Sequence, residues 1–192
     1  GINVNENNRT EPSGEITNYR TLYHHGKCKN KVILSTGMSD LKEIQKALSI
    51  LLLGYKNKPS NHDLIKNFSK KDVLILKKNV CILHCVSNYP TKIENLNLKC
   101  IQLLKDKFNL KVGFSDHTLS LTAASYAVSL GADIIEKHIT LDRKKKKPDY
   151  ITSFNPSDFQ DYVNFFKLKY LDAYKKKKVA ISKKEIIYCR VM

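Results

Sequence analysis

Short apolar runs alternate along this chain with longer stretches that have the polar and apolar spacing of helices. The runs are bounded by turn-forming residues, and they predict buried strands at 31–35, 80–85, 110–114 and 133–137, with a remnant of a fifth strand near Ser13. Strands that alternate with helices are typical of parallel sheets. The pattern therefore predicts an α/β fold.

Helix signals stand between the predicted strands. Asp40 and Glu43 have the spacing of a capping box, and the leucines and isoleucines that follow them form an apolar stripe. Helical spacing also predicts helices at about 95–107, 119–130 and 156–172. Each predicted strand is thus followed by a polar loop or a helix before the next strand begins.

The alternation is interrupted in three places. Residues 1–10 are polar and rich in asparagine, which predicts a disordered leader. Residues 55–79 are rich in lysine and asparagine, and we place them on the surface. From residue 174 the chain is lysine-rich, which predicts a C-terminal tail over 174–192. The domain proper is expected over 11–173.

Two histidines stand where predicted strands end. His117 follows the strand at 110–114, His138 follows the strand at 133–137, and one predicted helix lies between them. Parallel neighbours lie roughly 4.8 Å apart per strand step, so both imidazoles emerge at the carboxyl edge of the sheet. One divalent cation would then bind both at about 2.1 Å. The alternative is that both are ordinary hydrogen-bonded histidines of the sheet.

Carboxylates and hydroxyls fall at the same predicted edge. Glu136 lies two residues before His138, so both point to one face of the strand, and Glu15 stands two residues after Ser13 in the same way. Such a carboxylate can act as a base, or it can form a buried ion pair with a lysine. Small hydroxyls at strand ends can bind a phosphate or simply form turns, and four serines stand there: Ser13, Ser35, Ser87 and Ser115.

Lysine dominates the net charge of +16. Only four of the 34 basic residues are arginines. Arginine makes the bidentate contacts by which proteins recognise guanine and phosphate, so the composition favours a solvated lysine surface over a nucleic-acid site. Phosphorylated small molecules are a second class of partner that this charge would attract.

The cysteines and the hydropathy indicate a cytoplasmic protein. The five cysteines have no zinc-type spacing, and Cys81 and Cys85 lie about 13 Å apart along one strand, too far for a disulfide. Free thiols predict a reducing compartment. The sequence contains no run of 18 apolar residues and no signal-peptide pattern, so no membrane partner is expected.

Five short motifs follow one another at the predicted strand ends: Pro12–Asn18, Ile33–Met38, His84–Pro90, Gly113–Thr118 and Ile135–His138. In order and approximate spacing they resemble the motifs of the sialic acid (N-acetylneuraminate) synthase family, over about residues 11–165. Relative to that family, residues 55–79 look like an insertion of about 20 residues. The resemblance implies a (β/α)8 barrel of the TIM type.

The resemblance also implies an activity, a cofactor and site residues. The family condenses phosphoenolpyruvate with an N-acetylated aminosugar, such as N-acetylmannosamine, to a sialic-acid-type nonulosonate and releases phosphate. It implies that a divalent metal, Mn²⁺ or Mg²⁺, is held by His117 and His138, with Asp116 supporting His117. Glu136 would act as a base or position the sugar, with Glu15 as a second catalytic candidate. The remaining positions implied to contact substrate are Ser13, Ser35, Ser87, Tyr89, Ser115 and Asp149.

The chain also departs from the family. A complete barrel needs about 250 residues, whereas this chain has 192, and about five of the eight strands are predicted. The family's first three strands and its antifreeze-like C-terminal domain are not found, and Thr10 stands where the family has a phosphate-binding lysine. We therefore expect a partial barrel that is a fragment, a faulty gene model or a degenerate relative, and that is inactive by itself.

Two other functions remain open at this point. The first is a non-catalytic fragment or pseudoenzyme that retains a metal or sugar pocket. The second is a lysine-rich nucleic-acid binder, which we rank below both the synthase and the pseudoenzyme. Salt-dependent binding to DNA or RNA would reveal it. The sequence leaves open which aminosugar and which metal are used, and whether the chain forms a homo-oligomer.

Overall fold

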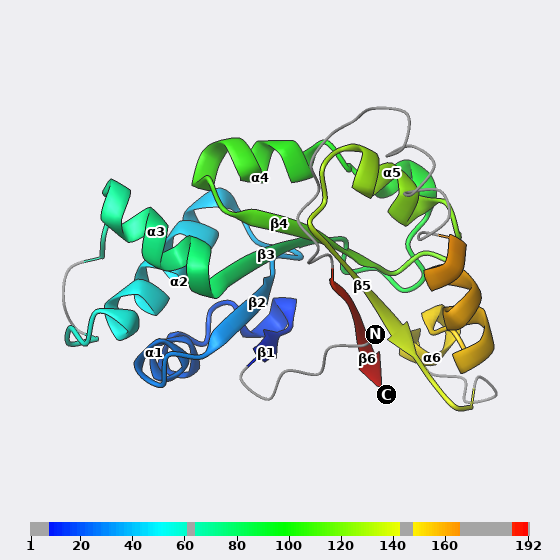
Figure 1. Ribbon diagram of the computed structural model, residues 1–192, viewed down its shortest axis with the longest axis horizontal. Helices are drawn as coiled ribbons and strands as arrows, with labels where there is room; N and C mark the ends of the chain where they lie inside the picture. Colours follow the sequence, from blue (N-terminus) through cyan, green and yellow to red (C-terminus); the bar gives the residue numbers. More distant parts are fainter. Residues whose placement is uncertain (1–7, 61–63, 143–147, 166–185, 192) are drawn as a thin grey trace.

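A six-stranded sheet forms the centre of the molecule, in which every neighbouring pair of strands is parallel and the strand order follows the sequence (Figure 1). The computed structural model describes residues 8–60, 64–142, 148–165 and 186–191. The strands are β1 (Asn8–Glu11), β2 (Lys31–Ser35), β3 (Val80–Cys85), β4 (Lys111–Asp116), β5 (Ile134–Ile139) and β6 (Ile186–Val191). This strand order is that of the wall of a β/α barrel.

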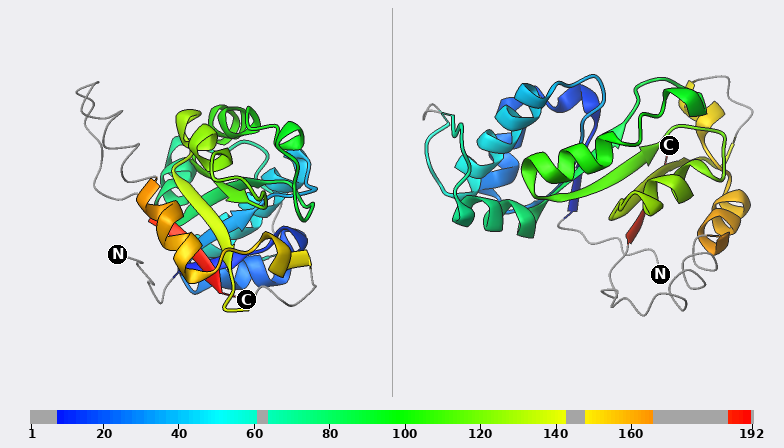
Figure 2. Two further views of the ribbon diagram at one scale, coloured as in Figure 1. Left: turned by 90° about the vertical axis from the view of Figure 1, so that its right-hand side faces the viewer. Right: turned by 90° about the horizontal axis from the view of Figure 1, so that it is seen from above.

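Helices connect the strands and lie around the outside of the sheet (Figure 2). A further helical stretch covers residues 156–165. The helices and single 3-10 turns with defined bounds are η1 (Ser13–Glu15), α1 (Tyr19–Lys27), α2 (Leu41–Tyr55), α3 (Lys70–Asn79), η2 (Ile93–Asn95), α4 (Cys100–Phe108), α5 (Ala123–Ser129) and α6 (Pro148–Thr152). The predicted capping box of α2 is present, since Asp40 Oδ1 accepts the Glu43 backbone N–H at 2.8 Å.

Strands β2 to β5 confirm the four strands predicted at 31–35, 80–85, 110–114 and 133–137. The predicted remnant near Ser13 is β1, which ends two residues before that serine. The predicted disordered leader is wrong at residues 8–10, because their backbone pairs with β2 despite their polar side chains. Residues 1–7 lie outside the described part of the chain.

The sixth strand, β6, was missed because it lies within the segment predicted to be a lysine-rich tail. Its six residues pair with β5 from Ile134 to Ile139, so this part of the predicted tail belongs to the sheet. The remainder, 174–185 and 192, lies outside the described residues. The sheet therefore has six strands where five were predicted.

Helix α3 occupies the second half of the segment predicted to be a surface insertion. Ser69 caps it, and Asp72 completes the capping box and forms an ion pair with Lys56 at 2.7 Å. Leu76 is fully buried in the main core. This half of the segment is thus an amphipathic helix packed on the sheet, and only its polar face is surface.

The two faces of the sheet differ in the side chains that they bury. The face toward the helices carries the main core, including Leu34, Ile82, Val112 and Phe114. The opposite face carries a small apolar cluster, which consists of Ile33, Cys81 and Leu83 with Ile134 packed against it. These four residues lie toward the amino ends of their strands, so the carboxyl half of this inner face is left for polar side chains.

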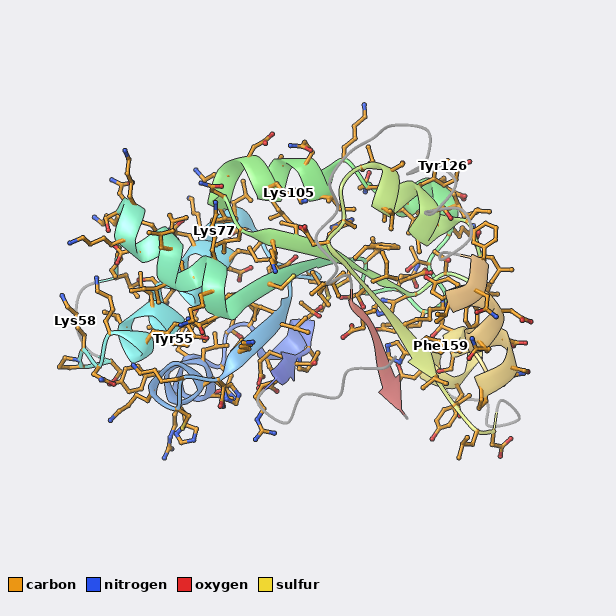
Figure 3. All side chains as sticks on the ribbon, viewed as in Figure 1. Tyr55, Lys58, Lys77, Lys105, Tyr126 and Phe159 are labelled. Carbon is orange, nitrogen blue, oxygen red and sulfur yellow. The ribbon has the colours of Figure 1, made fainter. Side chains whose placement is uncertain are left out.

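The outer surface is rich in lysine. Lys58 and Lys77 project from the outside of the molecule, whereas Lys105 pairs with Asp133 at 2.9 Å (Figure 3). No helix in the described ranges is long and apolar enough to cross a membrane. The four cysteines whose side chains are described, Cys28, Cys81, Cys85 and Cys100, are free thiols, as the sequence predicts.

Candidate active site

Polar side chains fill the carboxyl half of the inner face, where the strands continue the period of two that begins with the small apolar cluster. Ser115 on β4 is the register partner of Cys85 on β3 and of Glu136 on β5, so the three form one row across the sheet. His117, directly after β4, and His138, on β5, follow two residues further along. The alternation that places the small apolar cluster on the inner face thus also places the candidate site residues on that face.

The two histidines lie next to each other. Their ring centroids are 5.2 Å apart at an interplanar angle of 67°, and both side chains are buried. Tyr89 stacks on His117 at 4.2 Å between centroids and meets His138 edge-on at 5.9 Å. Sequence reasoning placed all three residues in the site, and the structure brings them together.

His117 has one defined tautomer. Its Nδ1–H donates to the carbonyl of Val86 at 2.9 Å, because a carbonyl can only accept. Burial lowers the pKa of His117, which the hydrogen bond to Val86 and the charge of Asp116 oppose. The neutral ring therefore presents the lone pair of Nε2 to the site.

Ser115 connects His117 to Glu136. Its Oγ donates to Glu136 Oε1 at 2.7 Å and lies 3.2 Å from His117 Nε2. A hydroxyl has one proton, and the shorter contact commits it to the carboxylate. The oxygen of Ser115 therefore turns a lone pair toward Nε2, and a cation or a proton at Nε2 would be stabilised there.

These features fit a divalent metal. A metal-binding imidazole needs a free nitrogen lone pair, with its other nitrogen held by a hydrogen bond, and His117 meets both conditions. Two ligand bonds of about 2.1 Å are compatible with ring centroids 5.2 Å apart. Within the described ranges, no group of three or more His, Cys, Asp and Glu side chains forms a metal cluster.

A second group of small polar side chains surrounds Gly37, just beyond β2. The N–H of Gly37 donates to Ser13 Oγ at 3.0 Å, and Ser13 Oγ lies 3.1 Å from Cys85 Sγ. A Cβ placed on Gly37 would overlap Ser87 Oγ and lie 2.7 Å from Ser13 Oγ. Two of the four predicted serines thus converge on one glycine.

Gly37 and Cys85 are the residues of this pocket that sequence reasoning did not select. The same period of two would have found them, because Gly37 stands two residues after Ser35 and Cys85 two residues before Ser87. Burial raises the pKa of the Cys85 thiol, so this thiol stays protonated and acts as a small, weakly polar wall of the pocket.

The other predicted site residues lie on three different elements, and the predicted strand that would carry Ser13 and Glu15 on one face is the 3-10 turn η1. Ser35 ends β2 on the same face and is buried. Glu15 lies on η1 and accepts a hydrogen bond from Asn18 Nδ2 at 2.8 Å. Asp149 lies on α6, close enough for its charge to raise the pKa of His117 slightly against the effect of burial. Their roles in binding or catalysis stay predictions.

The predicted support of His117 by Asp116 is wrong in its geometry. The Nδ1–H of His117 is bonded to Val86, while Asp116 points to the opposite face of β4 and pairs with Lys137 at 3.4 Å. Residues next to each other in a strand point to opposite faces, so Asp116 cannot reach the ring of His117 directly.

Comparison with known proteins agrees with this geometry. Residues 11–177 match the model of the NeuB family. The chain is 41% identical to the N,N'-diacetyllegionaminic acid synthase of Legionella pneumophila over 79% of this chain, and 42% identical to that of Campylobacter jejuni over 78%. It spans only 38% and 39% of those two relatives.

A solved structure shows the same fold. The N-acetylneuraminic acid (sialic acid) synthetase of Leptospira borgpetersenii, determined with citrate, superposes with a TM-score of 0.65 at 32% identity, covering 82% of this chain and 48% of the synthetase. The six-stranded sheet is therefore part of a TIM-type barrel. With a family match that extends from residue 11 to residue 177, this chain belongs to the NeuB family.

Proposed function

We propose that the protein to which this chain belongs condenses phosphoenolpyruvate with an N-acetylated aminosugar, N-acetylmannosamine or a related one, to a sialic-acid-type nonulosonate and releases phosphate. The observation that carries this proposal is the juxtaposition of His117, His138 and the Ser115–Glu136 pair at the carboxyl edge of the sheet. In barrels of this type, active sites are built at that edge. The family membership supports the same reaction.

The Gly37 pocket has the chemistry to bind a phosphate or a carboxylate. Ser13 Oγ accepts the N–H of Gly37, so its own proton can be donated to Cys85 Sγ or to a ligand, and Ser87 presents a second hydroxyl beside it. Because Gly37 has no side chain, the hydroxyls of Ser13 and Ser87 can lie against its backbone, and an anion would bind to these hydroxyls. We assign phosphoenolpyruvate to this pocket.

His117 and His138 would hold the divalent metal, Mn²⁺ or Mg²⁺. When bound, that metal would polarise the aldehyde oxygen of the sugar. Tyr89 covers one side of both imidazoles and limits the access of water to them. Asp149 is the candidate partner for sugar hydroxyls on the α6 side.

Glu136 is the candidate base, with Glu15 as a second candidate. In the reaction, the C2=C3 double bond of phosphoenolpyruvate supplies the electrons for a bond from C3 to the sugar aldehyde carbon, and the aldehyde oxygen takes up a proton to become a hydroxyl. Water then adds at C2 and gives up a proton, and the C2–O bond to phosphate breaks. Glu136 is almost fully buried and already accepts the proton of Ser115, so it can take a proton from the attacking water through a short hydrogen bond. The free thiols of this chain agree with a reducing, cytoplasmic setting for the reaction.

The proposal can be tested in a chimera in which residues 11–165 replace the matching segment of the Legionella pneumophila synthase. We expect Mn²⁺-dependent phosphate release from phosphoenolpyruvate with an N-acetylated aminosugar, and its loss on His138→Ala. Binding of Mn²⁺ and sugar without phosphate release by a folded chimera would instead favour the non-catalytic alternative. Equal release by the His138→Ala chimera would rule out the assigned role of His138.

A further inference from the structure

A buried ion pair lies behind the two strands that carry the histidines. Lys137 Nζ lies 3.4 Å from Asp116 Oδ2, and neither side chain has any exposed area. The two residues are direct cross-strand partners in the register of β4 and β5. Both point away from the face that carries His117 and His138, because side chains alternate along a strand. Each charged residue therefore stands between two site residues of its own strand.

Neighbouring aromatic residues enclose the same pair. Tyr162, on the helical stretch 156–165, donates its hydroxyl proton to Asp116 Oδ2 at 3.1 Å. The ammonium of Lys137 lies 4.5 Å from the centroid of the Phe154 ring, within the range of a cation–π contact. The pair thus joins both strands to the outer helical layer.

The pair also holds the backbone directly after His117. Asp116 Oδ1 accepts the N–H of Thr118 at 2.8 Å, and Lys137 Nζ donates to the carbonyl of Thr118. Asp116 from β4 therefore fixes the N–H of Thr118, and Lys137 from β5 fixes the carbonyl of the same residue. The carbonyl of His117 is fixed as well, since it accepts the N–H of Thr91 at 2.9 Å.

A gain in folding stability does not by itself explain why a charged pair is buried here. Burial of two charges carries a desolvation cost, and well-packed apolar residues in the same place are often as stable or more stable. The adjacent residues on this face, Phe114 and Phe154, are apolar and buried. What an apolar pair cannot do is hold the N–H and the carbonyl of Thr118 at the same time.

We propose that Asp116 and Lys137 are positioning residues, which fix the chain at His117–Thr118 against β5 and so set the separation of the His117 and His138 rings. The inference deepens the proposed function and rests on it, because the separation matters for metal binding by these two histidines. The positioning itself can be measured without metal.

The test replaces the pair by apolar residues, Asp116→Leu with Lys137→Met, so that no single charge stays buried. A matched control, Lys105→Met with Asp133→Asn, removes the partly exposed pair at the amino end of β5. A milder variant, Tyr162→Phe, removes only the hydroxyl that bonds Asp116, and it decides the test if the double variant does not fold.

Two measurements are made on each chain. NMR without metal reports the nuclear Overhauser effect between the rings of His117 and His138, whose centroids lie 5.2 Å apart. Electron paramagnetic resonance measures the concentration of free Mn²⁺ and so gives the affinity of each chain for Mn²⁺. We expect the double variant to lose the ring contact and to bind Mn²⁺ about 10- to 100-fold more weakly. Tyr162→Phe should show a smaller loss of both, and the control none.

An unchanged ring contact and an unchanged affinity in the folded variants would overturn the positioning role. If the wild-type chain shows the ring contact but binds no Mn²⁺, the metal role of the histidines is wrong, and the ring contact alone still decides the positioning role. The two proposals therefore fail in distinguishable ways.

Discussion

At the scale of single residues, Gly37 decides what the serine pocket can hold. It is buried, its N–H is bonded to Ser13, and three polar side-chain atoms lie where a Cβ would stand. The hydroxyls of Ser13 and Ser87 are the far ends of short side chains, so a methyl group would displace them without breaking the strand. A change here should therefore alter ligand binding more than the fold.

We predict that Gly37→Ala, made in the chimera, raises KM for phosphoenolpyruvate by about 10- to 100-fold. One lost charge-assisted contact costs roughly 1.5–3 kcal/mol, and about 1.4 kcal/mol corresponds to a factor of ten. Mn²⁺ affinity should stay unchanged, because the histidines lie on other strands. Steady-state phosphate release measures KM, and an unchanged KM would show that phosphoenolpyruvate does not use this pocket.

A second residue-scale prediction concerns His84, which points away from the site. Its Nε2 donates to the carbonyl of Leu96 at 2.7 Å, and burial lowers its pKa against the effect of that hydrogen bond. The side chain of a histidine in the unfolded chain has a pKa near 6.5. Because the pKa of His84 is lower in the folded state, the neutral ring contributes to the free energy of unfolding above about pH 6.5. This contribution is lost as the pH falls through the folded-state pKa of His84.

Urea denaturation of the chain should therefore show a midpoint that drops as the pH falls below about 6.5. His84→Gln can keep a donor for the Leu96 carbonyl but cannot titrate, so the drop should be smaller in this variant. An equal drop in both proteins would assign the acid sensitivity to other groups.

Residue-level prediction from the sequence depended on the period of two along a strand. Applied to Ser13 and Glu15 the rule was wrong, because both residues lie on the 3-10 turn η1 and not on a strand. Applied to β5 it was right. It selected Glu136 with His138, which share one face. The assignment of Asp116 to His117 ignored the same rule. Lys137 was not selected because a lysine is rarely buried, and only the structure shows the Asp116 carboxylate that pairs with it.

At the scale of elements, the contact between α1 and α2 depends on two glycines. A Cβ on Gly54 would lie 2.5 Å from the carbonyl oxygen of Tyr23 and 2.8 Å from Cα of Gly26. These are backbone atoms, which cannot move without shifting a helix. The close approach of the two helices is therefore possible only without side chains at this crossing.

We predict that Gly54→Ala lowers the free energy of unfolding by about 1–3 kcal/mol, the usual cost of overpacking. The better helix propensity of alanine offsets only part of this cost. Gly14→Ala is the matched control, because nothing lies within 4 Å of its added Cβ. Thermal unfolding of both variants measures the difference, and equal melting temperatures would contradict the tight crossing.

Prediction of the elements themselves depended on how apolar each segment is. Strands β2 to β5 contain buried apolar runs, so their sequence identified them. The polar β1 was predicted only as a remnant near Ser13, because its strand conformation comes from pairing with β2, which has no local sequence signal. The apolar run of β6 was missed because it follows a lysine-rich stretch and was assigned with it to the C-terminal tail.

At the scale of the whole molecule, the described sheet is an open part of a barrel. Strands β1 and β6 are the two edge strands of the described sheet, whereas in a closed barrel the first and last strands pair with each other. The carboxyl edge of these six strands carries both histidines and the serine pocket. The remaining wall of the site would have to come from strands beyond those described here.

We therefore predict that the 192-residue chain by itself binds Mn²⁺ but shows no measurable phosphate release. The motif resemblance predicts a family lysine at the position of Thr10, and phosphoenolpyruvate carries about three negative charges, so the loss of this charge-assisted contact would cost roughly 1.5–3 kcal/mol. The loss of this one contact weakens binding by about 10- to 100-fold. The chimera supplies the remaining wall from the Legionella pneumophila synthase, so release should appear in the chimera. In a second chimera that starts at residue 10 of this chain, release should increase with Thr10→Lys. Rapid release by the isolated chain, abolished by His138→Ala, would show that six strands suffice for the reaction.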